Sequence, residues 1–186
     1  EQQGVPAQER PGLMALLDLD HFKSVNDRYG HAVGDAALVE VARRLRSVTR
    51  DGDLLVRWGG EEFLLVALGL SDEQADALMR RTLHAVAEAP VVVGELKIAL
   101  TASLGYACWP LQPGAENLRA MQALNLVDGA LHVAKNAGRD RACRLVGILA
   151  REAEPLADGL HDLAAAERTG AVRLVRWTRT AGEWSA

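Results

Sequence analysis

Two runs of strand-forming residues separated by a pair of glycines constrain the fold of this chain more than any other feature. The runs are Leu54-Leu55-Val56-Arg57-Trp58 and Glu61-Glu62-Phe63-Leu64-Leu65-Val66, and the pair between them is Gly59-Gly60. A glycine pair in this setting predicts a β-hairpin, and we expect its tight turn to require positive φ angles. The chain should therefore contain an antiparallel pair of strands here.

The rest of the pattern predicts strands and helices that alternate along the chain. We expect strands at residues 13–17, 91–93 and 98–109, and helices at residues 36–45, 71–89 and 116–136. Asp35 stands where a capping residue would begin the first helix, and Ser71-Asp72-Glu73-Gln74 has the form of a capping box. This order predicts a mixed α/β (α+β) fold with helices packed on a central sheet.

The length and composition fit one domain with an appendage. Of the 186 residues, 49% are apolar and 25% are charged, which is enough for a packed core. We expect a tail or linker at residues 1–12, the domain at residues 13–147, and a C-terminal extension of unknown role at residues 148–186. The extension carries no chemical motif, so it is either a packing appendage or the start of a further domain.

Charge, cysteines and apolar runs exclude several classes of partner. A formal charge of −4 gives no basic field for a nucleic-acid polymer. Cys108 and Cys143 lie far apart without metal-ligand spacing, which favours a reducing cytoplasm over a zinc site or a disulfide. No apolar run approaches the roughly 20 residues that span a bilayer. Because the sequence does not begin with Met, we expect a fragment, and any membrane anchor would lie in a missing N-terminal region.

Acidic residues stand at the ends of two expected strands. Asp18-Leu19-Asp20 ends the first strand, and Glu61-Glu62 follows the glycine pair. A hairpin folded beside the first strand would gather these carboxylates at one edge of the sheet. Mg²⁺ binds one or two carboxylates together with water and substrate phosphates, so the arrangement favours a two-metal site for phosphoryl transfer.

Each of these residues also has a structural interpretation. Asp20 could cap a short helix over residues 22–28, and Asp35 could do no more than cap its own helix. A glutamate pair after a turn is often solvated surface.

Several short blocks of the sequence occur together in a fixed order. They are Asp18-Leu19-Asp20-His21-Phe22-Lys23-Ser24-Val25-Asn26-Asp27, Gly30-His31, Gly34-Asp35, Gly59-Gly60-Glu61-Glu62-Phe63, Ser103-Leu104-Gly105, Asp128-Gly129-Ala130-Leu131 and Ala134-Lys135-Asn136-Ala137-Gly138-Arg139-Asp140. In this order the blocks resemble the GGDEF domain of diguanylate cyclases. The resemblance implies a mostly antiparallel five-stranded sheet surrounded by helices, like the nucleotidyl cyclases and polymerase palm domains. It also implies condensation of two GTP into cyclic di-GMP and two pyrophosphates.

The resemblance assigns metal-binding and catalytic roles to the acidic residues. Asp18 and Glu61 match the carboxylates that hold the metal, the Leu19 carbonyl lies beside them, and Glu62 is a further catalytic carboxylate near by. It implies two Mg²⁺ (or Mn²⁺) ions in each active site.

The resemblance also assigns the residues that bind GTP. Asn26 and Asp35 match the residues that read the guanine, and Lys135 and Arg139 match the pair that binds the triphosphate. Their i, i+4 spacing would place both cations on one helix face. Gly59 and Gly60 lack Cβ atoms, so we expect a bound nucleotide to approach the backbone there. We expect the backbone N–H groups of Phe22 and Lys23, at the start of a helix, to bind the terminal phosphates.

A dimer and a second site follow from the same resemblance. Each GTP must offer its 3′-hydroxyl to the α-phosphate of the other, so two domains must face each other. Arg50 and Asp53 fit the Arg-x-x-Asp motif at which family members bind cyclic di-GMP as a feedback inhibitor. The strand residues between Asp53 and Gly59 span about 17 Å, so inhibition would not compete with GTP. The alternative function is a non-catalytic cyclic di-GMP receptor.

Overall fold

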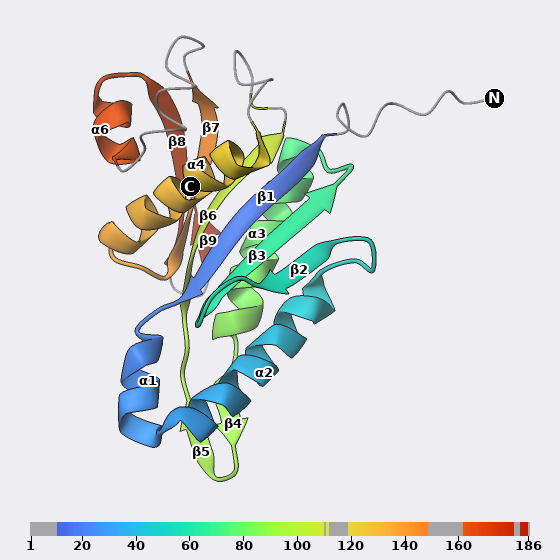
Figure 1. Cartoon of the computed structure of the whole chain (residues 1–186), viewed down its shortest axis with the longest axis vertical. Helices are drawn as coiled ribbons and strands as arrows, with labels where there is room; N and C mark the ends of the chain where they lie inside the picture. The colour runs from blue at the N-terminus through green and yellow to red at the C-terminus, as the bar shows by residue number, and fades with distance from the viewer. Residues whose placement is uncertain (1–10, 110, 112–118, 149–161, 181–182, 186) are drawn as a thin grey trace, which may run out of the picture.

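A computed structural model describes residues 11–109, 111, 119–148, 162–180 and 183–185. Its strands are β1 (Gly12–Leu19), β2 (Leu54–Arg57), β3 (Glu62–Leu68), β4 (Val91–Val93), β5 (Leu96–Ile98), β6 (Ala102–Trp109), β7 (Arg141–Ile148), β8 (Val172–Thr180) and β9 (Glu183–Ser185). Its helices are α1 (Phe22–Tyr29), α2 (His31–Val48), α3 (Asp72–Ala87), α4 (Ala120–Asn136) and α6 (Leu163–Arg168). Figure 1 shows the sheet running through the middle of the molecule with helices on both faces.

The main sheet has seven strands in the order β2-β3-β1-β6-β7-β8-β9. Neighbouring strands are antiparallel except β6 and β7, which are parallel. The predicted mixed fold, with a mostly antiparallel sheet surrounded by helices, is therefore confirmed. The expected number of five strands is wrong because β8 and β9 extend the sheet beyond β7. The expected strand at residues 91–93 is β4, which pairs with β5 in a separate small sheet.

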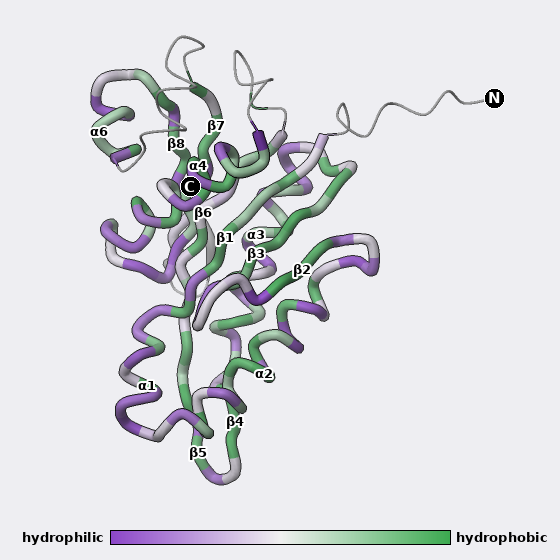
Figure 2. The backbone as a smooth tube through the Cα atoms, viewed as in Figure 1, coloured by the Kyte–Doolittle hydropathy of each residue, from purple (hydrophilic) through white to green (hydrophobic). Residues whose placement is uncertain are grey.

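Two apolar cores lie on the two faces of the sheet. On one face, Leu17 and Phe63 belong to a buried cluster with Val41 of α2 and Leu83 of α3. On the other face, α4 and α6 pack over a second buried cluster. β1 and β3 are among the most hydrophobic parts of the chain, whereas α1 is largely hydrophilic (Figure 2). α4 lies almost directly on β6, since a Cβ atom on Gly105 would come within 2.1 Å of the α4 backbone.

Local capping signals predicted one helix start correctly and two incorrectly. The capping box of Ser71 and Gln74 is present at the start of α3. Asp35 is not a cap, because α2 begins at His31, directly after Gly30, whose φ is 83°. Asp20 does not cap α1 either, since His21 occupies the N-cap position with a left-handed φ of 57°.

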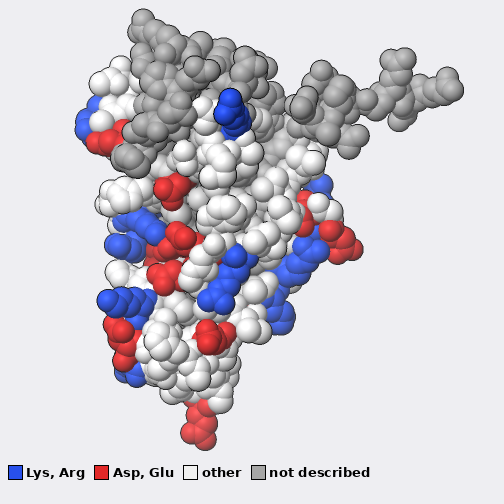
Figure 3. Space-filling view, in the orientation of Figure 1, with Lys and Arg blue, Asp and Glu red and all other residues white. Residues whose placement is uncertain are grey.

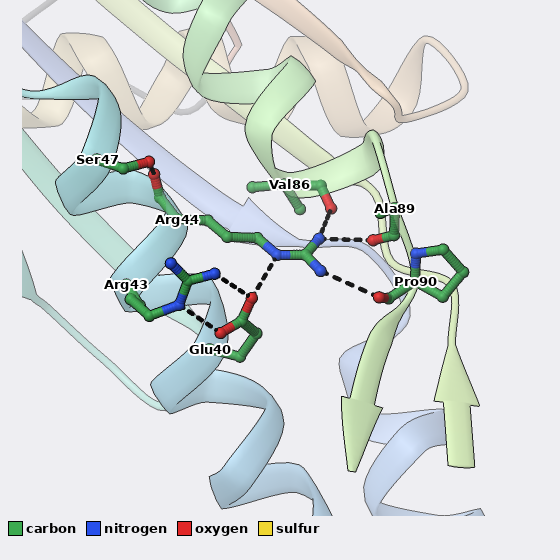
Figure 4. A network of polar contacts seen from close by, with 7 residues as sticks. All are labelled: Glu40, Arg43, Arg44, Ser47, Val86, Ala89 and Pro90. Carbon is green, nitrogen blue, oxygen red and sulfur yellow. Dashed lines mark hydrogen bonds and ion pairs between the residues drawn. The ribbon is translucent and has the colours of Figure 1, made fainter. Parts of the chain in front are cut away.

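Arg44 ties α2 to the end of α3 (Figure 4). Its guanidinium donates hydrogen bonds to the carbonyl oxygens of Val86, Ala89 and Pro90, at 3.1, 2.6 and 3.0 Å. The bond to Val86 satisfies a carbonyl group in the last turn of α3, which the helix leaves without a partner, and the bonds to Ala89 and Pro90 hold the segment that follows the helix. Glu40 in turn accepts a hydrogen bond from Nε of Arg44 at 2.9 Å, which orients the guanidinium.

The described part of the C-terminal extension packs onto this same sheet. β8 pairs with β7 along its length, and Leu163 of α6 and Leu174 of β8 are buried in the core beside α4. Arg176 and Glu167 form an ion pair that joins β8 to α6. Residues 149–161 of the extension lie outside the described residues. Among the helices that the structure does describe, none has the length and hydropathy needed to cross a bilayer.

Candidate active site

Two strand ends bring the acidic residues together. β1 ends at Leu19, β3 begins at Glu62, and Asp18 pairs with Glu62 across the two strands. The backbone N–H of Leu19 donates a hydrogen bond to the carbonyl oxygen of Glu61, at 3.2 Å. Asp18 on β1, Glu62 on β3 and Glu61 directly before β3 therefore lie close together at one edge of the sheet, as the sequence pattern predicts.

Lys135 brings a cation to this acidic edge from the last turn of α4. Its Nζ lies 2.7 Å from Oδ2 of Asp18, whose side chain is only 10% exposed. α4 packs against β1, and Lys135 in its last turn therefore reaches the end of that strand. In Figure 3, acidic and basic side chains lie next to one another between the C-terminal end of α4 and α1.

The acidic edge carries more negative charge than Lys135 can neutralise. Burial raises the pKa of Glu61 above its ordinary value, and the neighbouring Asp18 and Glu62 carboxylates raise it further. The ammonium group of Lys135 acts in the opposite direction on the same pKa. A raised carboxyl pKa means that the ionised form is disfavoured, and a bound cation would relieve that cost.

The turn between β2 and β3 is shaped by its glycines, but not by positive φ angles. Neither Gly59 nor Gly60 has a positive φ, so that expectation is wrong. The turn runs over Trp58–Glu61 between the ends of the two strands, and this length removes the need for left-handed residues. A Cβ atom on Gly59 would lie 2.6 Å from a carboxylate oxygen of Glu62, so Gly59 leaves room for that side chain.

The expected guanine-binding residues lie where α1 and α2 meet. A Cβ atom on Gly34 would lie 1.9 Å from Oδ1 of Asn26, so the glycine lets this amide sit against α2. Asp35 follows on α2 and is exposed. Asp35 lines a groove of about 380 Å³, whose other lining residues are Leu38, Val39, Ala42, Leu55, Arg57 and Phe63. Arg57, which belongs to no sequence motif, also lines this groove, and its guanidinium donates a hydrogen bond to the carbonyl of Gly60 at 2.8 Å.

The start of α1 lies directly after the acidic edge. Phe22 is buried in the core, whereas Lys23 is exposed. His21 provides no side-chain cap for the helix. Since the first N–H groups of a helix have no partner within the helix, those of Phe22 and Lys23 are available to an anion.

Arg139 does not share a helix face with Lys135, contrary to the expectation from their spacing. α4 ends at Asn136, and Gly138, Arg139 and Asp140 follow with φ angles of 116°, 63° and 47°. This left-handed stretch turns the chain from α4 into β7. Arg139 therefore lies in the loop between α4 and β7, outside the helix that carries Lys135.

Arg50 and Asp53 lie together in a separate pocket. The Asp53 carboxylate accepts a hydrogen bond from the backbone N–H of Arg50 at 2.8 Å, which closes the turn before β2. The pocket has a volume of about 210 Å³ and is lined by Val48, Arg50, Asp53, Leu70, Gln74, Ala77, Leu78 and Arg81. The place of Arg81 in this pocket could not be predicted from the sequence, because a residue 31 positions beyond Arg50 gives no local sign of proximity.

The donor set at the acidic edge fits a magnesium ion but is not a complete metal cage. Within the described part of the chain, no group of three or more His, Cys, Asp or Glu side chains is placed to hold a metal. The expected ligands Asp18, Glu61 and the Leu19 carbonyl would provide two carboxylates and one neutral oxygen. Mg²⁺ accepts such a partial set, because it fills its remaining positions with water and substrate phosphates.

The family of this chain follows from comparison with known proteins. The family model "Diguanylate cyclase, GGDEF domain" matches residues 2–141. The chain therefore belongs to the GGDEF domain family, as the sequence blocks suggested. It is 34% identical over 155 residues to the bifunctional diguanylate cyclase/cyclic di-GMP phosphodiesterase MucR of Pseudomonas aeruginosa, covering 83% of this chain and 22% of that protein. It is 36% identical over 126 residues to diguanylate cyclase A of Treponema denticola, covering 68% and 33%.

Solved structures agree with this assignment. Diguanylate cyclase SiaD from Pseudomonas aeruginosa, in complex with its activator SiaC, superposes with a TM-score of 0.68 at 37% identity, covering 75% of this chain and 52% of that one. The GGDEF domain of DgcB from Caulobacter crescentus, in complex with c-di-GMP, gives 0.66 at 25% identity, covering 73% and 78%. This chain matches only about a fifth to a third of the length of the curated relatives.

Proposed function

We propose that this chain is a diguanylate cyclase domain that condenses two GTP into cyclic di-GMP and releases two pyrophosphates. One observation carries the proposal: Asp18 and Glu61 lie side by side at the end of β1, with more negative charge than Lys135 neutralises. Among the relatives, diguanylate cyclase A carries this activity in its name.

Asp18, Glu61 and the Leu19 carbonyl would hold the metal, which we propose to be two Mg²⁺ (or Mn²⁺) ions. The chemistry that such ions would supply is neutralisation of the α-phosphate and a lowered pKa of the attacking 3′-hydroxyl. Glu62 adds negative charge beside them. Lys135 would then turn from Asp18 toward the phosphates, because a bound cation takes over its role at that carboxylate.

The groove beside α2 would bind the guanine, and the start of α1 would bind the phosphates. The Asp35 carboxylate can accept hydrogen bonds from the guanine ring N–H and exocyclic amine, and Asn26 lies close to the same end of α2. The backbone N–H groups of Phe22 and Lys23 would meet the terminal phosphates, together with Lys135 and Arg139. Adenine has no donor at the equivalent ring nitrogen, so the groove should reject ATP.

Catalysis would need a homodimer. One domain offers one guanine groove and one acidic edge, whereas the reaction joins two nucleotides in both directions. Each 3′-oxygen attacks the α-phosphorus of the partner GTP, the bond to the leaving pyrophosphate breaks, and the hydroxyl proton passes to solvent or a nearby carboxylate. Two domains must therefore face each other in antiparallel orientation. Because the substrate is GTP and the cysteines are free, we propose that the domain works in the cytoplasm.

The pocket of Arg50, Asp53 and Arg81 would bind the product as a feedback inhibitor. Its two guanidinium groups can pair with guanine N7 and O6 or with phosphate, and its carboxylate can accept from a guanine edge. DgcB, a structural relative, has been crystallised with c-di-GMP. The pocket is lined by other residues than the guanine groove, so product and GTP would not compete for one site.

The deciding experiment is product identification. The chain, dimerised through a fused leucine zipper, is incubated with Mg²⁺ and GTP, and in parallel with Mg²⁺ and ATP. We expect cyclic di-GMP and pyrophosphate from GTP and no turnover of ATP. If the dimerised chain binds cyclic di-GMP but never converts GTP, the receptor alternative replaces the cyclase.

A further inference from the structure

Asp20 stands beside the acidic edge but has a different environment from Asp18. It is 5% exposed and accepts hydrogen bonds from the hydroxyls of Thr101 and Ser103, each at 2.7 Å. Its Oδ2 also accepts a hydrogen bond from the backbone N–H of Asp140, at 3.0 Å. A buried carboxylate with three such donors is fixed in place, and its oxygens are directed at protein groups.

The third of these bonds closes a loop whose backbone is unfavourable on its own. Gly138, Arg139 and Asp140 all have positive φ angles. Residues with a side chain, such as Arg139 and Asp140, rarely adopt positive φ angles, and the surrounding structure must then stabilise this backbone conformation. The Asp20 carboxylate, reaching Asp140 across 120 positions of sequence, supplies such an enforcing contact.

The same loop is anchored at both of its ends, to Asp18 in β1 and to Asp20 directly after this strand. At the start, Nζ of Lys135 lies 2.7 Å from Asp18. At the far end, the N–H of Asp140 bonds to Asp20. Residues 135–140 are therefore held at both ends by the segment that carries Asp18, and Arg139 lies between the two contacts.

We propose that Asp20 is a positioning residue for the triphosphate site, which holds Arg139 in place through the N–H of Asp140 and does not itself bind the metal. This inference rests on the proposed function for the identity of the ligand. The position of the loop does not depend on it. What Asp20 must supply is a hydrogen-bond acceptor at Oδ2, and its negative charge is secondary.

Two substitutions at Asp20 separate an acceptor from a charge. Asp20→Asn keeps an oxygen that can accept from Asp140 and Thr101, and its amide can donate to Ser103. Asp20→Ala removes the acceptor. Ser103→Ala is the matched control, because it removes a hydrogen bond from Oδ1 and leaves the bond to Asp140 intact. If Asp20→Ala does not fold, Asp20→Ser replaces it, since its shorter side chain cannot reach Asp140.

Each variant is measured in two ways with the whole chain. The first is hydrogen exchange at the Asp140 amide, and the second is affinity for a GTP analogue that cannot be cleaved at the α-phosphate, with Mg²⁺ present. For Asp20→Ala we expect at least tenfold faster exchange and at least tenfold weaker binding. For Asp20→Asn and Ser103→Ala we expect both values within about threefold of the parent.

The contrary outcomes are distinct. Unchanged exchange and unchanged affinity in Asp20→Ala would overturn the positioning role. Loss of Mg²⁺-dependent binding in Asp20→Asn, with its Asp140 amide still protected, would make Asp20 a metal carboxylate instead. If the parent binds no GTP analogue, the proposed function fails, while the exchange comparison still decides whether Asp20 holds the loop.

Discussion

Two clusters of acidic and basic side chains lie against different helices of this domain, and they differ in how their charges are balanced. At the acidic edge, next to α4, Asp18 and Glu61 share the single ammonium group of Lys135. In the second cluster, next to α3, Asp72 and Asp76 both bond to the guanidinium of Arg144. Each cluster sets at least two carboxylates against one cation. In the second cluster both carboxylates bond directly to the cation, whereas in the first Lys135 bonds to Asp18 and the pKa of Glu61 is raised.

In the second cluster both carboxylates are bonded to donors of the protein. Arg144 is nearly buried, and its guanidinium lies 3.0 Å from Oδ1 of Asp76, which also accepts the hydroxyl of Tyr106 at 2.8 Å. Burial raises the pKa of the Tyr106 hydroxyl, and the bond to Asp76 raises it further. Each carboxylate is directed at a donor within the protein, so no ligand is required to complete the cluster.

The difference gives a criterion for telling a ligand site from a structural ion cluster. At the acidic edge, burial raises the pKa of Glu61, and the neighbouring Asp18 and Glu62 carboxylates raise it further, so the ionised form of this side chain is disfavoured in the protein without a bound cation. Substitutions there should change chemistry more than stability, and substitutions in the second cluster should do the opposite.

Glu61→Gln should have the largest effect. The amide keeps the shape of the side chain but cannot supply the charge that holds the metal, so we expect turnover of GTP by the dimerised chain to fall at least about a hundredfold. The folded-state pKa of Glu61 is raised, so its ionised form disfavours folding above that pKa and has no such effect below the ordinary carboxyl value. The variant should therefore be as stable as the parent at pH 7, or more so. Near-parent turnover would refute the metal-binding assignment.

Arg144→Met should be the converse case. It leaves the Asp76 carboxylate largely buried without its cation, and we expect the free energy of unfolding to fall by about 2–4 kcal/mol. Affinity for GTP should stay within about twofold of the parent, as measured by titration beside urea unfolding. If GTP binding is lost while stability is kept, the two clusters have been assigned the wrong way round.

Arg50→Ala tests an intermediate case, in which the carboxylate is engaged within the protein and the cation is exposed. Asp53 already accepts from the backbone of residue 50, so truncating the side chain should leave the turn intact. We expect affinity for cyclic di-GMP to fall about tenfold and product inhibition to be relieved, with GTP affinity unchanged. Asp18→Asn should lose GTP and keep cyclic di-GMP. The reverse pattern for Arg50→Ala would place residues 50–53 in the substrate site.

The sequence was informative where the signal was local. The capping box of Ser71 and Gln74 and the hairpin around Gly59 depend on residues a few positions apart, and both are present. Asp35 failed as a helix start because the real start follows a backbone turn at Gly30, and the close packing of Gly34 on Asn26 favours the longer helix. No local sequence pattern predicts such a contact between helices.

The site followed the same rule. The meeting of Asp18 and Glu61 could be predicted, since it needs only a strand and a hairpin to pair. The pairing of Arg144 with Asp76 could not, because the two residues are 68 positions apart on elements whose register the sequence does not specify. Arg139 was misplaced because helix periodicity was extended past Asn136, where Gly138 ends it.

Glu40→Gln should have the smallest effect and sets the lower limit of the comparison, because this ion cluster lies on the surface. Hydrogen bonds from Arg43 and Arg44 lower the pKa of Glu40 from 4.5 to about 2. A lowered folded-state pKa gives stability that is present above the ordinary value and is lost as the pH falls through about 2. Since Arg43 is exposed and screened by solvent, we expect the variant to lose only about 0.5–1 kcal/mol at pH 7, and less in high salt. Urea unfolding between pH 7 and pH 2 measures this, with Glu88→Gln, at an exposed position 3.8 Å from His84, as the control that should change less. If the free energy of unfolding fell as much as for Arg144→Met, Glu40 would act through Arg44 on the end of α3. Burial would then not explain why some of these ion clusters contribute more to stability than others.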